Sequence, residues 1–269
     1  MSALTFELKG KPDQRLDLSP LTPAKLKDLR AKEIESLAVG TTRMKLTVGD
    51  AFNVKGNGAG SLRFVGTDGR CDKIGAGLTE GEIVVEGDSG AYLGASMKGG
   101  KIEVKGSSGV LAGASMSGGT IVIDGDAGER AAGIAVGETL GMRGGQLTIK
   151  GNAGPLLGER IRRGFVIVGG NAGDYAGGRM VAGTILFKRG VGRYAGFGLR
   201  RGSLIFVEAP KELLPTFCDC GVMEFDYLRL LDRWLRSTGE HVGLGLGDRA
   251  RRFMGDMAAL GKGEMLVIA

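Results

Sequence analysis

The residue types that most often perform catalysis are scarce in this chain. His241 is its only histidine, and it opens a glycine-rich segment that has the composition of a loop. A serine or cysteine nucleophile would therefore have a single imidazole available as its base. Structural zinc sites usually need four cysteine or histidine ligands, so Cys71, Cys218 and Cys220 would all have to converge on that histidine. We predict neither a catalytic residue nor a metal site on this chain.

Arginine is the one side chain with binding chemistry that gathers in a particular region. Between Leu156 and Gly202 there are nine Lys and Arg residues against two acidic residues, whereas the rest of the chain has 27 basic and 28 acidic residues. Guanidinium groups grip carboxylates through paired hydrogen bonds, so the region predicts a surface for a polyanion or an acidic protein face. A solvated edge without a ligand is the alternative. The candidate binding residues are Arg143, Arg160, Arg162, Arg163, Arg179, Arg193, Arg200 and Arg201.

An internal repeat determines how those arginines are placed. Each repeat opens with alternating apolar residues, the first of which are Ile83, Ile102, Ile121, Leu147, Val166, Ile185 and Leu204. The step is nineteen residues except for twenty-six between Ile121 and Leu147, which indicates an insertion of seven near residues 133–139. Alternation is typical of a half-buried strand, and glycines follow at fixed offsets where the backbone must turn. The pattern predicts a mainly β protein, a parallel β-solenoid with about nineteen residues in each coil.

Stacked coils would align arginines that are distant in the sequence. Residues at the same position of successive coils lie above one another, about 4.8 Å apart. Three arginine columns result: Arg143, Arg162 and Arg200; Arg160 and Arg179; and Arg163 and Arg201. Such rows of like charge suit a long, flexible polyanion. Few aromatic residues lie beside them, so we do not predict nucleic acid as the ligand.

The limits of the repeat divide the chain into three expected regions. Residues 1–45 should form an N-terminal strand and helix cap, residues 46–209 the glycine-rich β-helix, and residues 210–269 a C-terminal helical cap with a terminal strand. Caps of this kind cover the open strand edges of a solenoid. The patterns place a helix after Thr22 and Pro23, strands near 46–48 and 62–65, helices from Asp226 and over 248–260, and a final strand from Gly263.

The composition also bounds the cellular context. No apolar run approaches the eighteen residues that a membrane span needs, so we expect no membrane partner. The N-terminus has no basic segment followed by an apolar stretch, which argues against a signal peptide. Three cysteines without the spacing of a disulfide framework fit a reducing compartment. We expect a cytoplasmic protein.

The repeat and its flanks resemble a known family. The G-x-x-G-x-x-x-G turns resemble the right-handed β-helix domain shared by glutamate synthase and the C subunit of formylmethanofuran dehydrogenases. The segments LTPAKLKDLRAKEIESLAVG, EAPKELLPTF and GDMAALGKGEMLVIA resemble the flanks of the separate subunit. The chain is most similar to the C subunit of the bacterial formyltransferase/hydrolase complexes of methylotrophs.

This resemblance implies a non-catalytic scaffold inside an enzyme complex of one-carbon metabolism and formaldehyde oxidation. The complex would convert formyl-tetrahydromethanopterin through formyl-methanofuran (methylofuran) to formate. The implied partners are an amidohydrolase-like subunit, a formyltransferase subunit and a protein similar to a molybdopterin subunit. The implied carrier is of the methanofuran type, with a polyglutamate tail that the arginine columns would guide. No cofactor is expected on this chain itself.

The repeat is compatible with other interpretations. One is the C subunit of a tungsten or molybdenum formylmethanofuran dehydrogenase. Another is a structural β-solenoid that binds acidic partners without belonging to an enzyme. A glutamate synthase fragment is disfavoured, because a dedicated N-terminal segment precedes the repeats.

Overall fold

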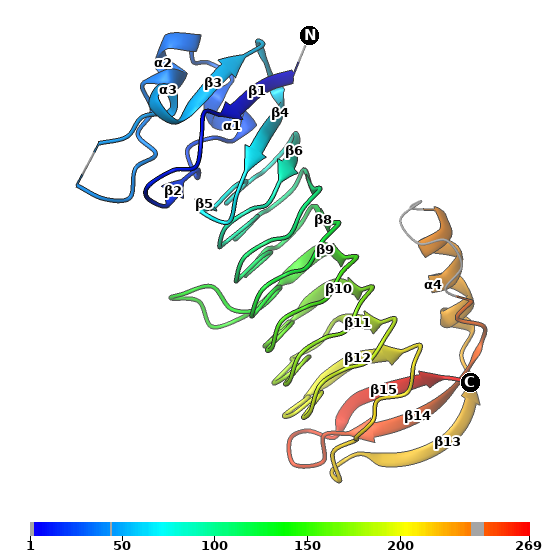
Figure 1. Ribbon diagram of the computed structural model, residues 1–269. Coiled ribbons are helices and arrows are strands. Elements are labelled where there is room, and N and C mark those ends of the chain that lie inside the picture. The colour runs from blue at the N-terminus through cyan, green and yellow to red at the C-terminus, as the bar shows by residue number, and fades with distance from the viewer. Residues whose placement is uncertain (1–2, 44, 238–244) are drawn as a thin grey trace.

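The protein is mainly β, with one large and mostly parallel sheet and few helices. The computed structural model describes residues 3–43, 45–237 and 245–269. Thirteen of its strands form one sheet in the order β13-β14-β15-β12-β11-β10-β9-β8-β7-β6-β4-β1-β3. Figure 1 shows these strands as successive rungs between an N-terminal region with α1–α3 and a C-terminal region with α4.

The repeats supply the parallel part of the sheet, one strand each. Its strands are β4 (Gly58–Thr67), β6 (Glu82–Gly87), β7 (Lys101–Val104), β8 (Thr120–Ile123), β9 (Arg143–Ile149), β10 (Arg163–Val168), β11 (Thr184–Phe187) and β12 (Arg201–Phe206). Ile102 lies opposite Ile83 on one side and Ile121 on the other, so the nineteen-residue period is the register of the ladder. The prediction of a mainly β, repeat-built protein is confirmed.

Each repeat also contacts the next away from its strand. A row of parallel bridges runs through Ser89, Ser108, Ala127, Ala153, Ala172 and Val191. The turns between are bonded in the same sense, since the amide of Gly94 donates to the carbonyl of Ile74 at 2.8 Å and that of Gly113 to Leu93 at 2.7 Å. A repeat is therefore bonded to its neighbour along its strand and along its turns.

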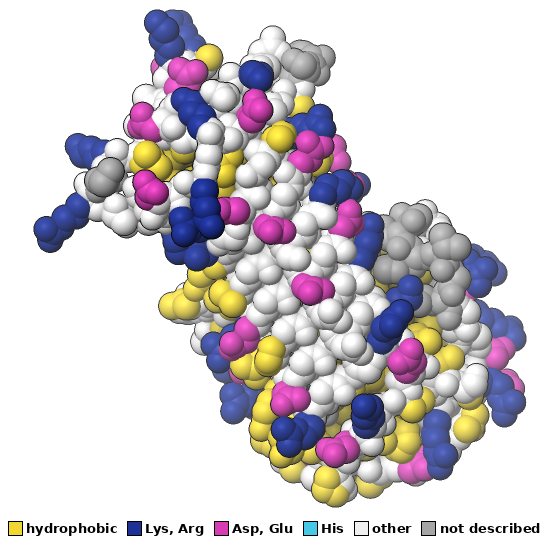
Figure 2. All heavy atoms as spheres, in the orientation of Figure 1, with side chains coloured by type: hydrophobic (Ala, Val, Ile, Leu, Met, Phe, Trp, Pro, Cys, Tyr) yellow, Lys and Arg dark blue, Asp and Glu magenta, His cyan; other side chains and the backbone are white. Residues whose placement is uncertain are grey.

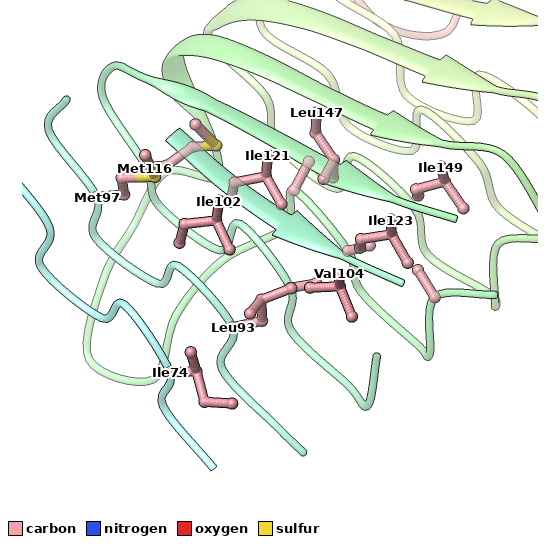
Figure 3. Close-up of a cluster of buried hydrophobic side chains, with 14 of the residues drawn as sticks. Ile74, Leu93, Met97, Ile102, Val104, Met116, Ile121, Ile123, Leu147 and Ile149 are labelled. Atoms are coloured by element: carbon pink, nitrogen blue, oxygen red, sulfur yellow. The ribbon is translucent and has the colours of Figure 1, made fainter. Parts of the chain in front are cut away.

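The core is a set of aliphatic columns between the strand and the turn of each repeat. Figure 3 shows two of them running along the strands, with Ile102, Ile121 and Leu147 in one column and Val104, Ile123 and Ile149 in the other. A methionine column closes the core at the turn before the strand, through Met97 and Met116. Each fully buried aliphatic side chain contributes about 1.5–3 kcal/mol to folding.

The seven extra residues form a loop, as the sequence predicts. Figure 1 shows it projecting between β8 and β9. The hydroxyl of Ser115, which is fully buried, accepts a hydrogen bond from the amide of Ala135 at 3.1 Å and donates to the carbonyl of Leu140 at 2.9 Å. One side chain of the preceding repeat thus holds both ends of the inserted loop.

The N-terminal region differs from the prediction in its helices. Strand β1 (Ala3–Leu8) pairs with β4 and with β3 (Phe52–Lys55), while β2 (Leu16–Asp17) pairs with β5 (Cys71–Asp72). The predicted helix after Thr22 is two short ones, α1 (Pro23–Leu26) and α2 (Ala31–Glu35), and the Thr22 side chain caps neither. The predicted strand at 46–48 is wrong: Thr47 caps α3 (Val48–Ala51) by accepting from the amide of Asp50.

In the C-terminal region a predicted helix is a strand. Residues 249–255 form β14 (Arg249–Gly255), which lies antiparallel between β13 (Cys218–Glu224) and β15 (Lys262–Ile268). The reason is the nonlocal partner: β15 extends the parallel ladder beside β12 and offers β14 a free edge. The predicted final strand is present as β15.

Helix α4 (Asp226–Ser237) begins where predicted. Its Leu228 and Leu235 pack on Ile167, Leu186 and Ile205, the outward-facing residues at the centres of β10, β11 and β12. On the same helix, Leu230 and Trp234 remain 62% and 40% exposed. The sheet is thus apolar on both faces near its C-terminal end. Within the described ranges, no helix is both long and apolar enough to cross a bilayer.

The close stacking of the turns gives a first test. Gly119 has φ +84°, and a Cβ placed on it would lie 2.7 Å from the carbonyl oxygen of Gly100 and 2.9 Å from the carbonyl carbon of Gly99. Gly66 has φ +73° but nothing within 4 Å of a Cβ. Both Gly→Ala variants bear the left-handed strain of about 1 kcal/mol, and Gly119→Ala should lose about 1–3 kcal/mol more from the backbone clash. Equal losses for the two variants in urea unfolding would contradict the close approach.

Candidate functional site

The predicted arginine columns follow the turns that precede the strands. The amide of Arg160 donates to the carbonyl of Gly178 at 3.0 Å, and the amide of Arg179 donates to that of Phe197 at 2.6 Å. The two arginines therefore occupy equivalent turns of adjacent repeats. Both have left-handed backbones, with φ of 56° and 53°.

The longer column is built in the same way. The amides of Arg143, Arg162 and Arg200 donate to the carbonyls of equivalent methionines, Met116, Met142 and Met180. The neighbouring Arg163 lies opposite Arg143 in the ladder, because the register shifts between Arg163 and Phe165. Arg201 lies opposite Lys262 of β15. These arginines thus share one edge of the stack and all are exposed.

Three of the arginines line one groove. Arg160, Arg179 and Arg200 surround a hollow of about 710 Å³ together with Val181 and Phe197, and none of the described acidic residues lines it. The opposite wall is the turn between β14 and β15, residues 258–260. Arg193 is not brought to this groove; it lines a separate hollow with Asp174 and Lys211.

Asp256 holds the wall of the groove in place. Its side chain is almost wholly buried, and its carboxylate accepts hydrogen bonds from the amides of Gly198 at 3.0 Å and Ala258 at 2.9 Å. Burial by itself would raise the pKa of Asp256, but hydrogen bonds from Thr216, Gly198 and Ala258 outweigh it and lower the pKa. The carboxylate therefore ties the β14–β15 turn to the repeat that carries Phe197.

The sequence did not identify this wall. Its residues belong to a segment that the sequence predicts to be a helix, and they meet the repeats through nonlocal contacts, namely the strand pairing with β15 and the hydrogen bond of Asp256 with Gly198. Asp256 is the one residue that could have indicated this wall, because it is an acidic residue between two strands that glycines flank. It does not indicate which distant part of the chain it contacts.

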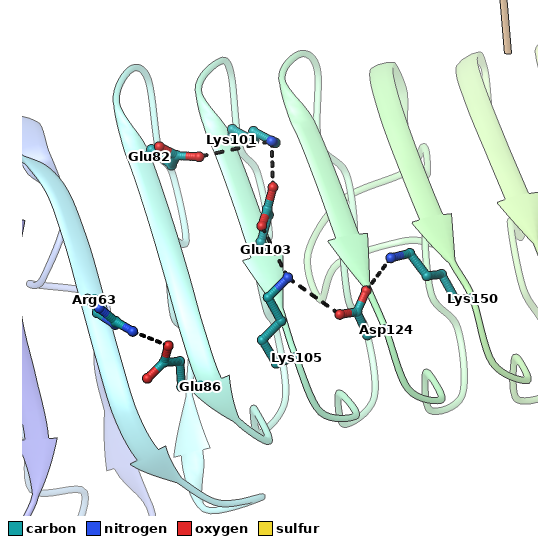
Figure 4. Close-up of polar contacts among 8 residues, drawn as sticks. All are labelled: Arg63, Glu82, Glu86, Lys101, Glu103, Lys105, Asp124 and Lys150. Carbon is teal, nitrogen blue, oxygen red and sulfur yellow. Dashed lines mark hydrogen bonds and ion pairs between the residues drawn. The ribbon is translucent and has the colours of Figure 1, made fainter. Parts of the chain in front are cut away.

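Charge pairing distinguishes the two halves of the stack. On the outer face of the first strands, carboxylates and amines alternate in a ladder through Glu82, Lys101, Glu103, Lys105, Asp124 and Lys150 (Figure 4). Here the hydrogen bond from Lys101 is the main cause that lowers the pKa of Glu103. Exposed pairs of this kind contribute about 0–1 kcal/mol each.

The arginines of the C-terminal half are mostly unpaired. Arg179 contacts Glu159 at 3.4 Å and Arg143 contacts Glu138 at 3.9 Å. The other six candidates have no ion pair with a carboxylate in the part of the chain that the structure describes; they are Arg160, Arg162, Arg163, Arg193, Arg200 and Arg201. Their guanidinium groups are available to an external anion.

The three cysteines considered for catalysis are not grouped, because Cys71 lies on β5 and the other two lie on β13. Cys71 is buried, and burial raises the pKa of its thiol to about 11, which disfavours the nucleophilic thiolate. Cys218 and Cys220 lie two residues apart on β13, where the Cys220 thiol donates to the carbonyl of Cys218 at 3.6 Å. His241 lies outside the described residues. Among the described residues, no three His, Cys, Asp or Glu side chains are grouped to hold a metal ion.

Comparison with known proteins identifies the family. The family model described as the GXGXG motif matches residues 72–234, more than half of the chain. The C subunit of the formyltransferase/hydrolase complex Fhc of Methylorubrum extorquens is 43% identical over 89 residues, which cover 33% of this chain and about a third (34%) of that protein.

A solved structure extends the similarity to the full length. A chain in the crystal structure of the formyltransferase/hydrolase complex (FhcABCD) from Methylorubrum extorquens, in complex with methylofuran, is 42% identical. It superposes with a TM-score of 0.93 over 98% of this chain and 99% of that chain. The chain belongs to the GXGXG family, as a C subunit of the formyltransferase/hydrolase type. The resemblance predicted from the repeat and its flanks is confirmed, and in this C subunit the arginine groove lies at the C-terminal end of the stack.

The role of Asp256 can be tested by pH. Because its folded pKa is depressed below the unfolded value of about 3.9, its stabilisation is present above pH 4 and is lost as the pH falls through the folded pKa. Asp256→Asn should lower the free energy of unfolding by about 1–3 kcal/mol at pH 7, and the deficit should shrink below pH 4. Exposed Asp28→Asn serves as the control. A deficit that is the same at pH 3 and pH 7 would contradict the assignment.

Proposed function

We propose that this chain is the non-catalytic scaffold subunit of a formyltransferase/hydrolase complex. The observation that carries the proposal is the full-length similarity to a chain of such a complex, at 42% identity and a TM-score of 0.93. The complex would move a formyl group from formyl-tetrahydromethanopterin to a methanofuran-type carrier and release it as formate. This chain would supply no reacting group to either step.

The scaffold would be a right-handed parallel β-helix, residues 46–209, between an N-terminal cap of residues 1–45 and a C-terminal cap of residues 210–269. Two parallel rows of backbone pairing support it, one along the strands and one through Ser89, Ser108 and Ala127. A helix of this kind is rigid along its axis, because each repeat is bonded to both neighbours. It therefore suits a protein that fixes the distance between other subunits.

The partners of this scaffold would be an amidohydrolase-like subunit, a formyltransferase subunit and a protein similar to a molybdopterin subunit. Holding two active sites at a fixed separation makes transfer between them intramolecular, with an effective concentration of about 1 mM for a short flexible tether. The carrier would be that tether.

The arginine edge would guide the polyglutamate tail of the carrier. Its residues would be Arg143, Arg160, Arg162, Arg163, Arg179, Arg193, Arg200 and Arg201. No acidic residue of the described ranges lines the groove, which supports this role. Successive carboxylates of a tail would meet the guanidinium groups of Arg160 and Arg200, which have no ion pair within those ranges, and of Arg179, which also contacts Glu159. Arg193 would act from the neighbouring hollow.

Charge reversal tests the tail proposal. In the assembled complex, Arg160→Glu, Arg162→Glu and Arg200→Glu together should raise the KM for the carrier at least tenfold, because three charge-assisted contacts become repulsive. Lys27→Glu, Lys32→Glu and Lys45→Glu, three exposed lysines at the other end of the chain, change the net charge equally and should leave the KM unaltered. Equal kinetics for the two triple variants would refute the tail site, and loss of assembly in the arginine variant would reassign the edge to a partner.

A further inference from the structure

An aromatic ledge lies beside the arginine groove, formed by Tyr175, Tyr194 and Phe197. These residues are 37%, 44% and 45% exposed, although aromatic residues are usually more deeply buried. The rings of Tyr175 and Tyr194 stack with centroids 4.9 Å apart, and Phe197 meets Tyr175 edge to face at 6.0 Å. The ledge is therefore one continuous surface that spans two adjacent repeats.

The fold does not require aromatic side chains at these turns. Tyr175 and Tyr194 have left-handed backbones with φ of 59° and 61°. The equivalent turns of earlier repeats have the same conformation with Lys73 at 59° and Arg130 at 58°, and also with Tyr92 at 62°, Leu111 at 64° and Leu156 at 59°. The turn therefore accepts both hydrophilic and apolar residues, and it does not itself require the exposed rings of Tyr175 and Tyr194.

The surroundings of the ledge combine apolar and basic groups. Beside Phe197, the β14–β15 turn exposes Leu260 at 55%, and Figure 2 shows apolar side chains gathering toward this C-terminal end of the molecule. On the other side of the ledge, Pro155 and Leu156 line a hollow of about 580 Å³ together with Tyr175 and Phe197, and the acidic residues Glu159 and Asp174 also line it. Protein–protein interfaces commonly have an apolar core surrounded by a polar rim. The exposed rings of the ledge, with a hollow on each side, resemble such a core.

Arginines flank this centre on two sides. Arg179 lines both hollows and Arg200 lines the groove, while Arg193 is adjacent to Tyr194 in the chain and faces the separate hollow with Asp174. Tyrosine and arginine are also the residue types that contribute most to interface energies. On the side of the groove, where arginines and no described acidic residue lie, the complementary surface is acidic beside an apolar centre.

We propose that the ledge of Tyr175, Tyr194 and Phe197 is the docking surface for another protein of the complex, which packs an apolar side chain against the rings and presents carboxylates to the flanking arginines. This inference rests on the proposed role within a complex. It assigns the rings of the ledge to a protein partner, and this partner and the carrier tail would share the arginines at the margin of the groove.

The charge of the groove indicates the chemistry of the partner. Among the described residues, three arginines and no acidic residue line the groove. A partner surface that carries carboxylates therefore complements it.

The test replaces the rings and keeps the backbone. In the double variant Tyr175→Asn and Tyr194→Asn, asparagine tolerates the left-handed conformation, so the turns should persist. The control is Tyr92→Asn, at the equivalent turn of an early repeat with φ 62°. All subunits of the complex are co-expressed with each variant, and the amount of this chain retained in the purified assembly is measured beside its melting temperature.

The double variant should be retained at less than a tenth of the wild-type amount, with the control retained fully and both melting temperatures close to wild type. Full retention of the double variant would overturn the proposal. If full retention were accompanied by a loss of carrier turnover, the ledge would instead be a stacking site for a small molecule. A wild-type chain that dimerises alone through the ledge would overturn it as well. A wild-type chain absent from the assembly would instead refute the proposed function itself.

Discussion

The register of nineteen residues is the constraint on which the rest of this structure depends. Each strand pairs with the equivalent strand of the next repeat, and each turn donates to the turn before it. The turns can approach one another this closely only where Cβ atoms are absent, as at Gly119. The same register carries every surface side chain to a fixed place above its equivalent. The period of the sequence therefore determines which surface side chains line up along the stack.

The outer surface uses this register in two ways. Along the first strands, amines and carboxylates alternate so that each repeat neutralises the next, as between Lys105 and Asp124. Along the later strands, the central outward residues are apolar and are covered by α4. The turns of these repeats carry the arginines of the groove, and no acidic residue of the described ranges lines that groove. The arginines of the groove thus lie at the C-terminal end of the stack. This arrangement, with few groups suited to catalysis, agrees with a protein that organises others.

Local periodicity made most of the architecture predictable, and nonlocal pairing limited the rest. The strands from Ile83 to Phe206, the inserted loop and the arginine columns all follow from spacing, because a residue and its neighbour in the next repeat are related by a constant step. The segment 248–260 has no such relation. Its strand, β14, forms because β15 offers a free edge for pairing. A short segment of mixed polar and apolar residues does not show from its own sequence that such an edge is available. The groove wall at Asp256 was missed for the same reason.

The central claim is that this chain organises the complex and supplies no chemistry to it. The most direct measurement compares three rates, with and without this chain, in a preparation of the remaining subunits: formyl transfer between soluble carriers, hydrolysis of the formylated furan carrier, and the coupled conversion. The account predicts that both separate steps persist without the chain, while the coupled rate falls until the chain is added back. Loss of either separate step, with recovery only on addition of this chain, would contradict it.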